Sequence, residues 1–118
     1  MFMMMFISKD VDQALDILEV WVKAGIEGVT IVESAGMQQL GKQGIPDDVG
    51  ILFSLSSFMR RQEIHHRTLF SAVKDEATLQ HAVEATTRYV GDWSKTDVGV
   101  LFVWPLSYAY GLDKGFNK

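Results

Sequence analysis

The chain has no cysteine, so neither disulfide bonds nor thiolate chemistry can contribute to its stability or function. Basic side chains are also few: 11 of them against 15 acidic ones leave a formal net charge of -4. This balance argues against sequence-independent binding of nucleic acid, which needs a basic face. No apolar run approaches the roughly 20 residues of a membrane span, so we expect no membrane insertion. With 47% apolar and 22% charged residues, the 118-residue chain is typical of one globular domain, residues 1–118.

The opening sequence MFMMMFI is apolar at every position. It lacks the basic region of a signal peptide and has about half the length that such a segment needs. A strand that is apolar on both faces is typical of a central or doubly covered position in a sheet. We therefore interpret residues 1–7 as a buried strand and expect a cytoplasmic protein.

A helix and a second strand follow. Asp10, with Gln13 three residues later, forms a capping-box pattern that predicts a helix start. Gly25 predicts its end, since glycine readily adopts the left-handed conformation that follows a helix. The β-branched run that begins at Val29 predicts a strand to about Ser34. The predicted apolar face of the helix comprises Val11, Ala14, Leu15, Leu18, Trp21 and Val22.

The same order recurs in the second half of the chain. Residues 68–73 predict a strand, Asp75 is suited to cap a helix that ends at Gly91, and residues 98–104 predict a fourth strand. The apolar face of this second helix comprises Leu79, Ala82, Val83, Thr86 and Val90. Two successive β-α-β units predict an α+β, ferredoxin-like βαββαβ sandwich: a four-stranded antiparallel sheet with both helices on one face.

About thirty residues separate the two halves, which is long for a structureless loop in a compact domain. A polar, turn-rich stretch comes first, and we expect a mobile, glycine-containing segment near residues 38–46. An apolar stripe at helical spacing then predicts a helical insertion near residues 48–60. The stripe consists of Ile51, Leu52, Leu55, Phe58 and Met59.

Residue types that often carry chemistry do not form a catalytic pattern here, so we expect no enzyme. His65 and His66 are adjacent, and adjacent residues of a strand point to opposite faces, which favours a polar strand start over a shared metal site. Serine, histidine and aspartate occur without a recognisable nucleophile motif. Trp93 has two interpretations that stay open: it stacks on a ligand's base, or it covers the end of the second helix.

Two stretches carry a family resemblance. The sequence GIEGVTIVE, continuing to Gly36, and the sequence DVGVLFV at residues 97–103 resemble the PII nitrogen-regulatory proteins and their PII-like relatives. The resemblance covers most of the chain. It implies a homotrimer that takes part in signal transduction and binds an adenine nucleotide in clefts between subunits. It also implies that the long loop after the second strand acts on a regulated partner protein.

The resemblance also implies a set of ligand-binding residues. Gly28 and Thr30 match the cleft lining at the start of the second strand, and Val73 matches an adenine contact. Gly99 matches the last glycine of the loop before the fourth strand, whose backbone amides surround phosphate. Gly36 and Met37 match the exit of the second strand, and Trp93 lies in the loop before the fourth strand. The expected site therefore comprises Gly28, Thr30, Gly36, Met37, Val73, Trp93 and Gly99.

Three departures from the family pattern concern phosphate. Asp97 stands where the family has a glycine, Val100 replaces the phosphate-binding lysine, and residues 107–113 contain no cation. A triphosphate needs basic groups or metal to offset its charge. We therefore expect an adenine nucleotide with fewer phosphates than ATP, or a different small-molecule effector. The alternative hypothesis is a trimer closer to the CutA proteins, with a metal-associated or structural role.

Overall fold

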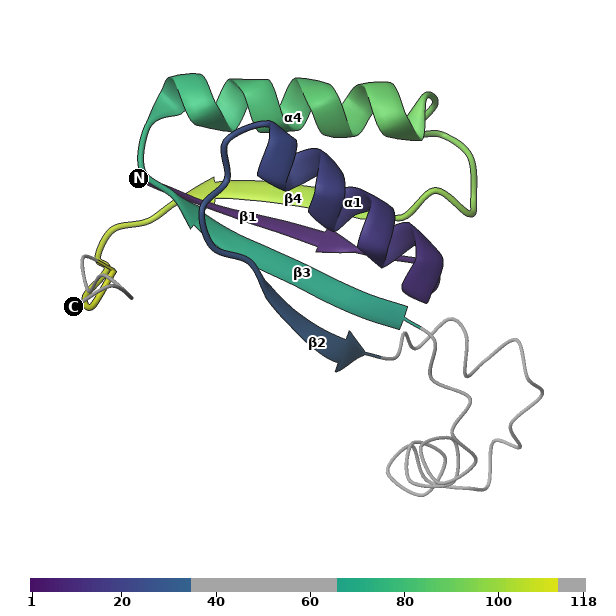
Figure 1. The fold of residues 1–118 in the computed structure, drawn as a ribbon, viewed down its shortest axis with the longest axis horizontal. Helices are drawn as coiled ribbons and strands as arrows, with labels where there is room; N and C mark the ends of the chain where they lie inside the picture. The colour runs from purple at the N-terminus through teal and green to yellow at the C-terminus, as the bar shows by residue number, and fades with distance from the viewer. Residues whose placement is uncertain (35–65, 113–118) are drawn as a thin grey trace.

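The computed structural model describes residues 1–34 and 66–112 of the chain. The predicted mobile segment near 38–46 and the predicted helix near 48–60 lie outside the described residues. The described elements follow the order β-α-β-β-α-β (Figure 1). They are β1 (Phe2–Ile7), α1 (Val11–Lys23), β2 (Thr30–Ser34), β3 (His66–Val73), α4 (Glu76–Val90) and β4 (Val100–Pro105).

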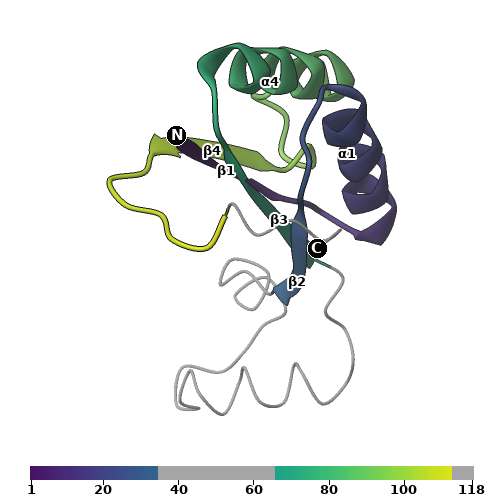
Figure 2. The same cartoon turned by 60° about the vertical axis from the view of Figure 1, so that its left-hand side comes forward.

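The four strands form one sheet in the order β2-β3-β1-β4, and every neighbouring pair is antiparallel. Helices α1 and α4 lie side by side on the same face of this sheet (Figures 1 and 2). The structure therefore confirms an α+β protein with a four-stranded antiparallel sheet, compatible with a ferredoxin-like fold. Strand β1 is central, as its apolar sequence predicts. Neither described helix has the length and apolarity needed to cross a membrane.

Strand β1 supplies the centre of the core. Its side chains alternate between the two faces of the sheet, as in any strand. Met4 and Phe6 point toward the helices and are completely buried. Phe6 lies opposite Leu69 of β3 and Leu101 of β4, so one row of apolar side chains crosses three strands beneath the helices. The described elements cover only this face of β1.

Helix α1 begins as predicted and buries Ala14 and Trp21 of the predicted apolar face, but other residues of that face are exposed. The Asp10 carboxylate accepts a hydrogen bond from the backbone N–H of Gln13 at 2.8 Å, the expected cap. The buried positions are Gln13, Ala14, Ile17 and Trp21. The predicted apolar face is wrong at Val11, Leu15 and Val22, which are 38%, 55% and 57% exposed. Leu15 and Val22 are seven apart, two helical turns, and therefore form their own stripe on the outer side of the helix.

Helix α4 confirms the second predicted apolar face. The Asp75 carboxylate accepts a hydrogen bond from the backbone N–H of Thr78 at 2.7 Å, and Gly91 ends the helix with a φ of 84°. Leu79, Ala82 and Thr86 are buried, while Val83 and Val90 are half-buried against the core.

The two helices are joined by a buried polar contact. Trp21 Nε1 donates a hydrogen bond to Thr86 Oγ1 at 2.9 Å, and that hydroxyl donates to the carbonyl oxygen of Ala82 at 2.6 Å. Both side chains have no exposed surface. Each buried donor therefore has a partner, which is the condition for polar groups to be tolerated in a core.

Strand β4 begins two residues later than predicted, at Val100. Gly99 has a φ of 89°, which is outside the extended region and prevents the strand from starting at residue 98. Strand β3 begins two residues earlier than predicted, at His66. The adjoining Arg67 exchanges hydrogen bonds with Ser8: Ser8 Oγ donates to its carbonyl oxygen and accepts from its backbone N–H.

Candidate functional site

The side of the sheet away from the helices is a candidate surface. Opposed residues of antiparallel strands share a face, so the strand register defines which side chains lie there. We term this surface the open face. Within the described strands it has no aspartate, glutamate, lysine or arginine, and most of its side chains are apolar. It comprises Met3, Met5, Ile7, Thr30, Val32, Ser34, His66, Thr68, Phe70, Ala72, Val100, Phe102 and Trp104.

Several large side chains of the open face contact solvent. Val100 and Phe102 are each 46% exposed, Val32 is 43% exposed and Trp104 is 40% exposed. The sequence analysis identified only the β1 part of this surface, because residues 1–7 are apolar on both faces. The signal for the β4 part was the alternation of Val100, Phe102 and Trp104, because residues two apart on a strand share a face.

Two of the predicted ligand-binding residues lie together at the start of β2. The carbonyl oxygen of Gly28 accepts a hydrogen bond from the Ser71 hydroxyl, and a Cβ at Gly28 would have no neighbour within 4 Å. Thr30 is exposed on the open face opposite Phe70. Val73, by contrast, is only 3% exposed and points into the core from the covered face. Gly28 and Thr30 are therefore accessible to a ligand, whereas the side chain of Val73 is buried in the core.

Trp93 and Gly99 form a second group, around Phe6. The ring of Trp93 packs against that of Phe6 at a centroid distance of 6.4 Å, and its Nε1 donates to Thr87 Oγ1 at 3.2 Å. A Cβ at Gly99 would lie 2.5 Å from Phe6 Cζ and 2.8 Å from the carbonyl oxygen of Ile7. In the single chain, Trp93 thus covers the edge of the core, and 36% of its surface stays exposed.

One copy of the chain does not bring these two groups together. Gly28 lies at the β2 edge of the sheet and Gly99 at the β4 edge, at opposite ends of the strands. With strands about 4.8 Å apart and a rise of about 3.3 Å per residue, the register separates the two glycines by about 20 Å. Gly36 and Met37 lie outside the described residues. The expected site could form only between two copies.

The loop from residue 92 to residue 99 has acidic character. The Asp92 carboxylate accepts hydrogen bonds from the backbone N–H of Ser94 at 3.0 Å and from its hydroxyl at 2.7 Å. These bonds lower the pKa of Asp92, so its charge persists at neutral pH. Lys95 is the only basic residue of this loop, and Asp97 lies 3.9 Å from Lys9 in an exposed ion pair. A polyphosphate would meet carboxylates here.

Among the described residues, Arg67 is a basic residue at the exit of β2, where it lies opposite Glu33. Its guanidinium lies 3.7 Å from the Glu33 carboxylate and donates a hydrogen bond to the carbonyl oxygen of His66 at 3.0 Å. The Arg67 guanidinium therefore already interacts with Glu33 and His66. His66 is the first residue of β3, and His65 lies outside the described residues.

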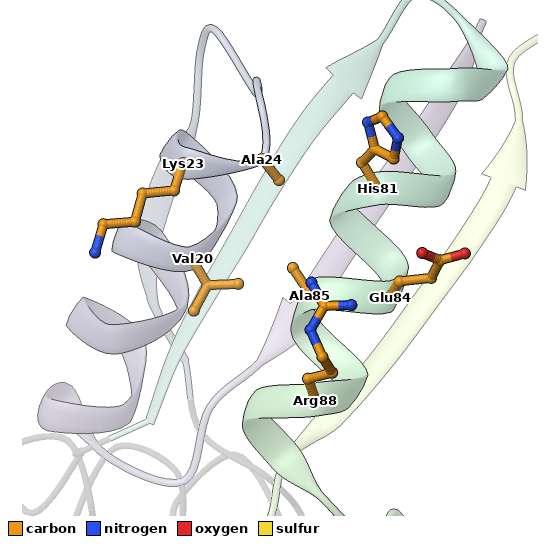
Figure 3. Close-up of a pocket in the computed structure, with 7 residues that line it drawn as sticks. All are labelled: Val20, Lys23, Ala24, His81, Glu84, Ala85 and Arg88. Carbon is orange, nitrogen blue, oxygen red and sulfur yellow. The ribbon is translucent and has the colours of Figure 1, made fainter.

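An open groove of about 480 Å³ lies between the two helices, and none of the described ligand-binding candidates lines it. In Figure 3 the side chain of Lys23 points away from α4, and its ammonium group pairs with Glu19 at 2.8 Å. The lining residues are Val20, Lys23, Ala24, His81, Glu84, Ala85 and Arg88 (Figure 3). Its polar side chains are of both signs and do not converge on one point, so the groove has no evident chemistry.

Within residues 1–34 and 66–112, no group of three or more histidine, aspartate or glutamate side chains could hold a metal ion. A scan of protein families finds no family model that matches the chain, and no curated protein sequence matches it. The residues and the geometry of the fold must therefore carry any functional conclusion.

Proposed function

We propose that this protein is a PII-like regulatory protein that works as a homotrimer. It binds a small-molecule effector in clefts between the copies and acts on a partner protein through residues 35–65, the loop after β2. The open face is the observation that supports this proposal most strongly. The resemblance of residues 25–36 and 97–103 supplies the number of copies and the regulatory role.

The open face favours self-association for a physical reason. Phe102 and Trp104 expose 46% and 40% of their surface on a sheet face whose described side chains include no aspartate, glutamate, lysine or arginine. Burying apolar surface is worth about 25 cal/mol per Å², and large contiguous apolar patches on folded proteins mark interaction sites. An uncharged face also suits a second uncharged face, because no carboxylate or ammonium group has to lose its hydration on contact.

The separation of the candidate residues supports a cleft between copies. Gly28 and Thr30 occupy one corner of the sheet, while Trp93 and Gly99 occupy the opposite corner. In a closed ring, equivalent contacts repeat from copy to copy, so one corner of each copy meets a different corner of the next. The resulting cleft would offer backbone groups and apolar surface, which suit a planar ring such as adenine.

Sedimentation of the purified chain at micromolar concentration tests the assembly. We expect a trimer, and we expect Phe102→Asp to convert it to a monomer because the new carboxylate would have to be buried without a partner. Val22→Asp is the matched control: it places the same charge at a 57% exposed residue of α1, on the far side of the sheet. A monomeric wild-type chain would contradict the proposal, as would a Phe102→Asp variant that still forms trimers.

Calorimetry with AMP, ADP and ATP tests the ligand. Each charge-assisted contact to phosphate contributes about 1.5–3 kcal/mol, and this chain lacks the cations for several of them. We therefore expect AMP or ADP to bind at least as tightly as ATP, and Gly28→Ala to weaken that binding without loss of the trimer. Much tighter binding of ATP would refute the expected ligand. Tight binding of a divalent metal without binding of any nucleotide would favour the CutA-like alternative.

A further inference from the structure

The segment that follows β4 has an unusual exposure of aromatic side chains. We term residues 106–112, with the sequence LSYAYGL, the tyrosine arm. Leu106 anchors the arm, since its backbone N–H donates a hydrogen bond to the carbonyl oxygen of Met1 at 3.0 Å. Beyond that bond, Tyr108 is 80% exposed and Tyr110 is 89% exposed. Tyr89, the remaining tyrosine, is 40% exposed and hydrogen-bonded to Asp16.

The arm leaves the sheet on the side away from the helices, which is the side of the open face (Figures 1 and 2). The arm contains no charged residue, and the described part of the open face contains no aspartate, glutamate, lysine or arginine. Tyr108 and Tyr110 lie only two residues apart, so the arm exposes two aromatic rings within a short stretch of chain.

The size of the open face indicates a role for the tyrosine arm in assembly. Four strands of about six residues span a face of about 20 Å by 20 Å, or about 400 Å². The accessible surface of its side chains is larger than this flat area, and a standard protein interface buries about 800 Å² of accessible surface on each partner. A buried tyrosine contributes about 150–250 Å², so the two tyrosines of the arm would enlarge the contact substantially. Tyrosine is also enriched at interfaces because its ring is rigid and its hydroxyl stays hydrated at the rim.

From these observations we propose that the tyrosine arm of each copy packs Tyr108 and Tyr110 against a second copy of the chain, next to the open face. This inference rests on the proposed self-association and adds the residues that complete the interface. The occupant is a second copy because the arm and the open face lie on the same side of the molecule, and neither has a described aspartate, glutamate, lysine or arginine.

The first test is the strength of self-association of the double variant Tyr108→Ser, Tyr110→Ser, measured by sedimentation over a dilution series. An interface hot spot contributes a factor of about 30 or more to the dissociation constant, so we expect at least that loss. The matched control is Leu15→Ser, Val22→Ser, which removes two exposed apolar side chains from the outer side of α1. Equal self-association of the tyrosine variant and the control would overturn the proposal.

The second test separates the arm from the assembly. Nitration by tetranitromethane, followed by mass spectrometry, measures the accessibility of each tyrosine. We expect Tyr108 and Tyr110 to react slowly in the wild-type assembly and quickly in the Phe102→Asp variant, with Tyr89 equally reactive in both.

Other outcomes of the nitration experiment would refute the arm contact. Fast nitration of both arm tyrosines in an intact trimer would overturn the arm contact and leave the trimer standing. Protection in both the wild type and the monomeric variant would show that the same chain covers the rings, which also refutes the inference. A wild-type chain that is monomeric throughout would refute the proposed function and the arm contact together.

Discussion

The two faces of the sheet are built from the same four strands and are almost equally apolar, yet they differ in what covers them. Beneath the helices, Met4, Phe6 and Leu69 have no exposed surface, although Ile31 and Val103 of the edge strands are each 40% exposed on the same side of the sheet. On the open face, Phe102 and Trp104 keep close to half of theirs. Apolar character therefore does not by itself distinguish a core position from an interface position. The difference is the amphipathic helices, which pack on one face alone.

The largest expected contrast compares the two faces directly. Phe6→Ala leaves a cavity in the completely buried row beneath the helices, and we expect the free energy of unfolding to fall by about 3–5 kcal/mol. Phe102→Ala, at a 46% exposed position, should lower it by less than about 1 kcal/mol when both proteins are compared as monomers. Urea unfolding at submicromolar concentration measures both. Equal losses would show that the open face is a core surface of the single chain.

A second contrast concerns the glycines of the candidate site. Gly99→Ala forces a Cβ to within 2.5 Å of Phe6 at a positive φ, and we expect a loss of about 2–4 kcal/mol in the free energy of unfolding. Gly91→Ala isolates the backbone contribution, since its φ of 84° is similar and nothing lies within 4 Å. It should cost about 1 kcal/mol. Gly28→Ala, with neither constraint, should cost less than about 0.5 kcal/mol.

Thermal or urea unfolding of the three glycine variants distinguishes these contributions. Equal effects of Gly99→Ala and Gly91→Ala would show that the close packing on Phe6 contributes nothing. The result also determines which variants are suitable for binding experiments, because only a glycine whose substitution leaves stability unchanged reports on the ligand alone.

A third contrast concerns the buried hydrogen bond between the two helices that cover one face of the sheet. Thr86→Val preserves the shape of the side chain but leaves Trp21 Nε1–H without its acceptor, and we expect a loss of about 1–3 kcal/mol in unfolding free energy. Thr87→Val is the matched control, because it removes an acceptor from Trp93 where that bond is exposed to water. Water can replace the lost partner there, so the control should lose less than about 1 kcal/mol. Similar losses in both variants would contradict the importance of burial.

The smallest expected effect is the pH dependence of the exposed contact between the helices. Partial burial, followed by the 2.7 Å hydrogen bond to Asp16, raises the pKa of Tyr89 to about 12. A raised pKa in the folded state means that this contact contributes stability below pH 10, which is lost as the pH rises toward 12. Asp16→Asn should shift the Tyr89 titration, followed by NMR of the ring carbon, toward the ordinary value. The effect on stability should be below about 1 kcal/mol because the pair is exposed.

Much of the fold could be predicted because its signals are local. The caps at Asp10 and Asp75 depend on residues three positions away, and the end of α4 depends on Gly91 alone. The face of α1 was mispredicted for the opposite reason. Leu15 and Val22 are as apolar as Ile17, and only the position of the helix over the sheet decides that Ile17 is the buried one. The start of β4 likewise depends on a tertiary constraint, the packing of Gly99 against Phe6.

The candidate site was the harder prediction. The resemblance selects Gly28, Val73 and Gly99 in the same way, but the fold gives them different environments: one open, one buried in the core and one packed on an aromatic ring. The open face as a whole was not predicted, because its residues come from all four strands. Side chains brought together by strand order leave no contiguous pattern in the chain.

The sequence by itself determined the kind and order of the described elements, because helix caps, glycine stops and the alternation of side chains act over a few residues. It also determined that both faces of β1 would be apolar. Only the tertiary structure decided which face the helices cover, which tyrosines stand in solvent, and that Gly28 and Gly99 lie at opposite corners of the sheet. Those features depend on how separate strands pair and where helices pack, and such contacts join residues far apart in the chain.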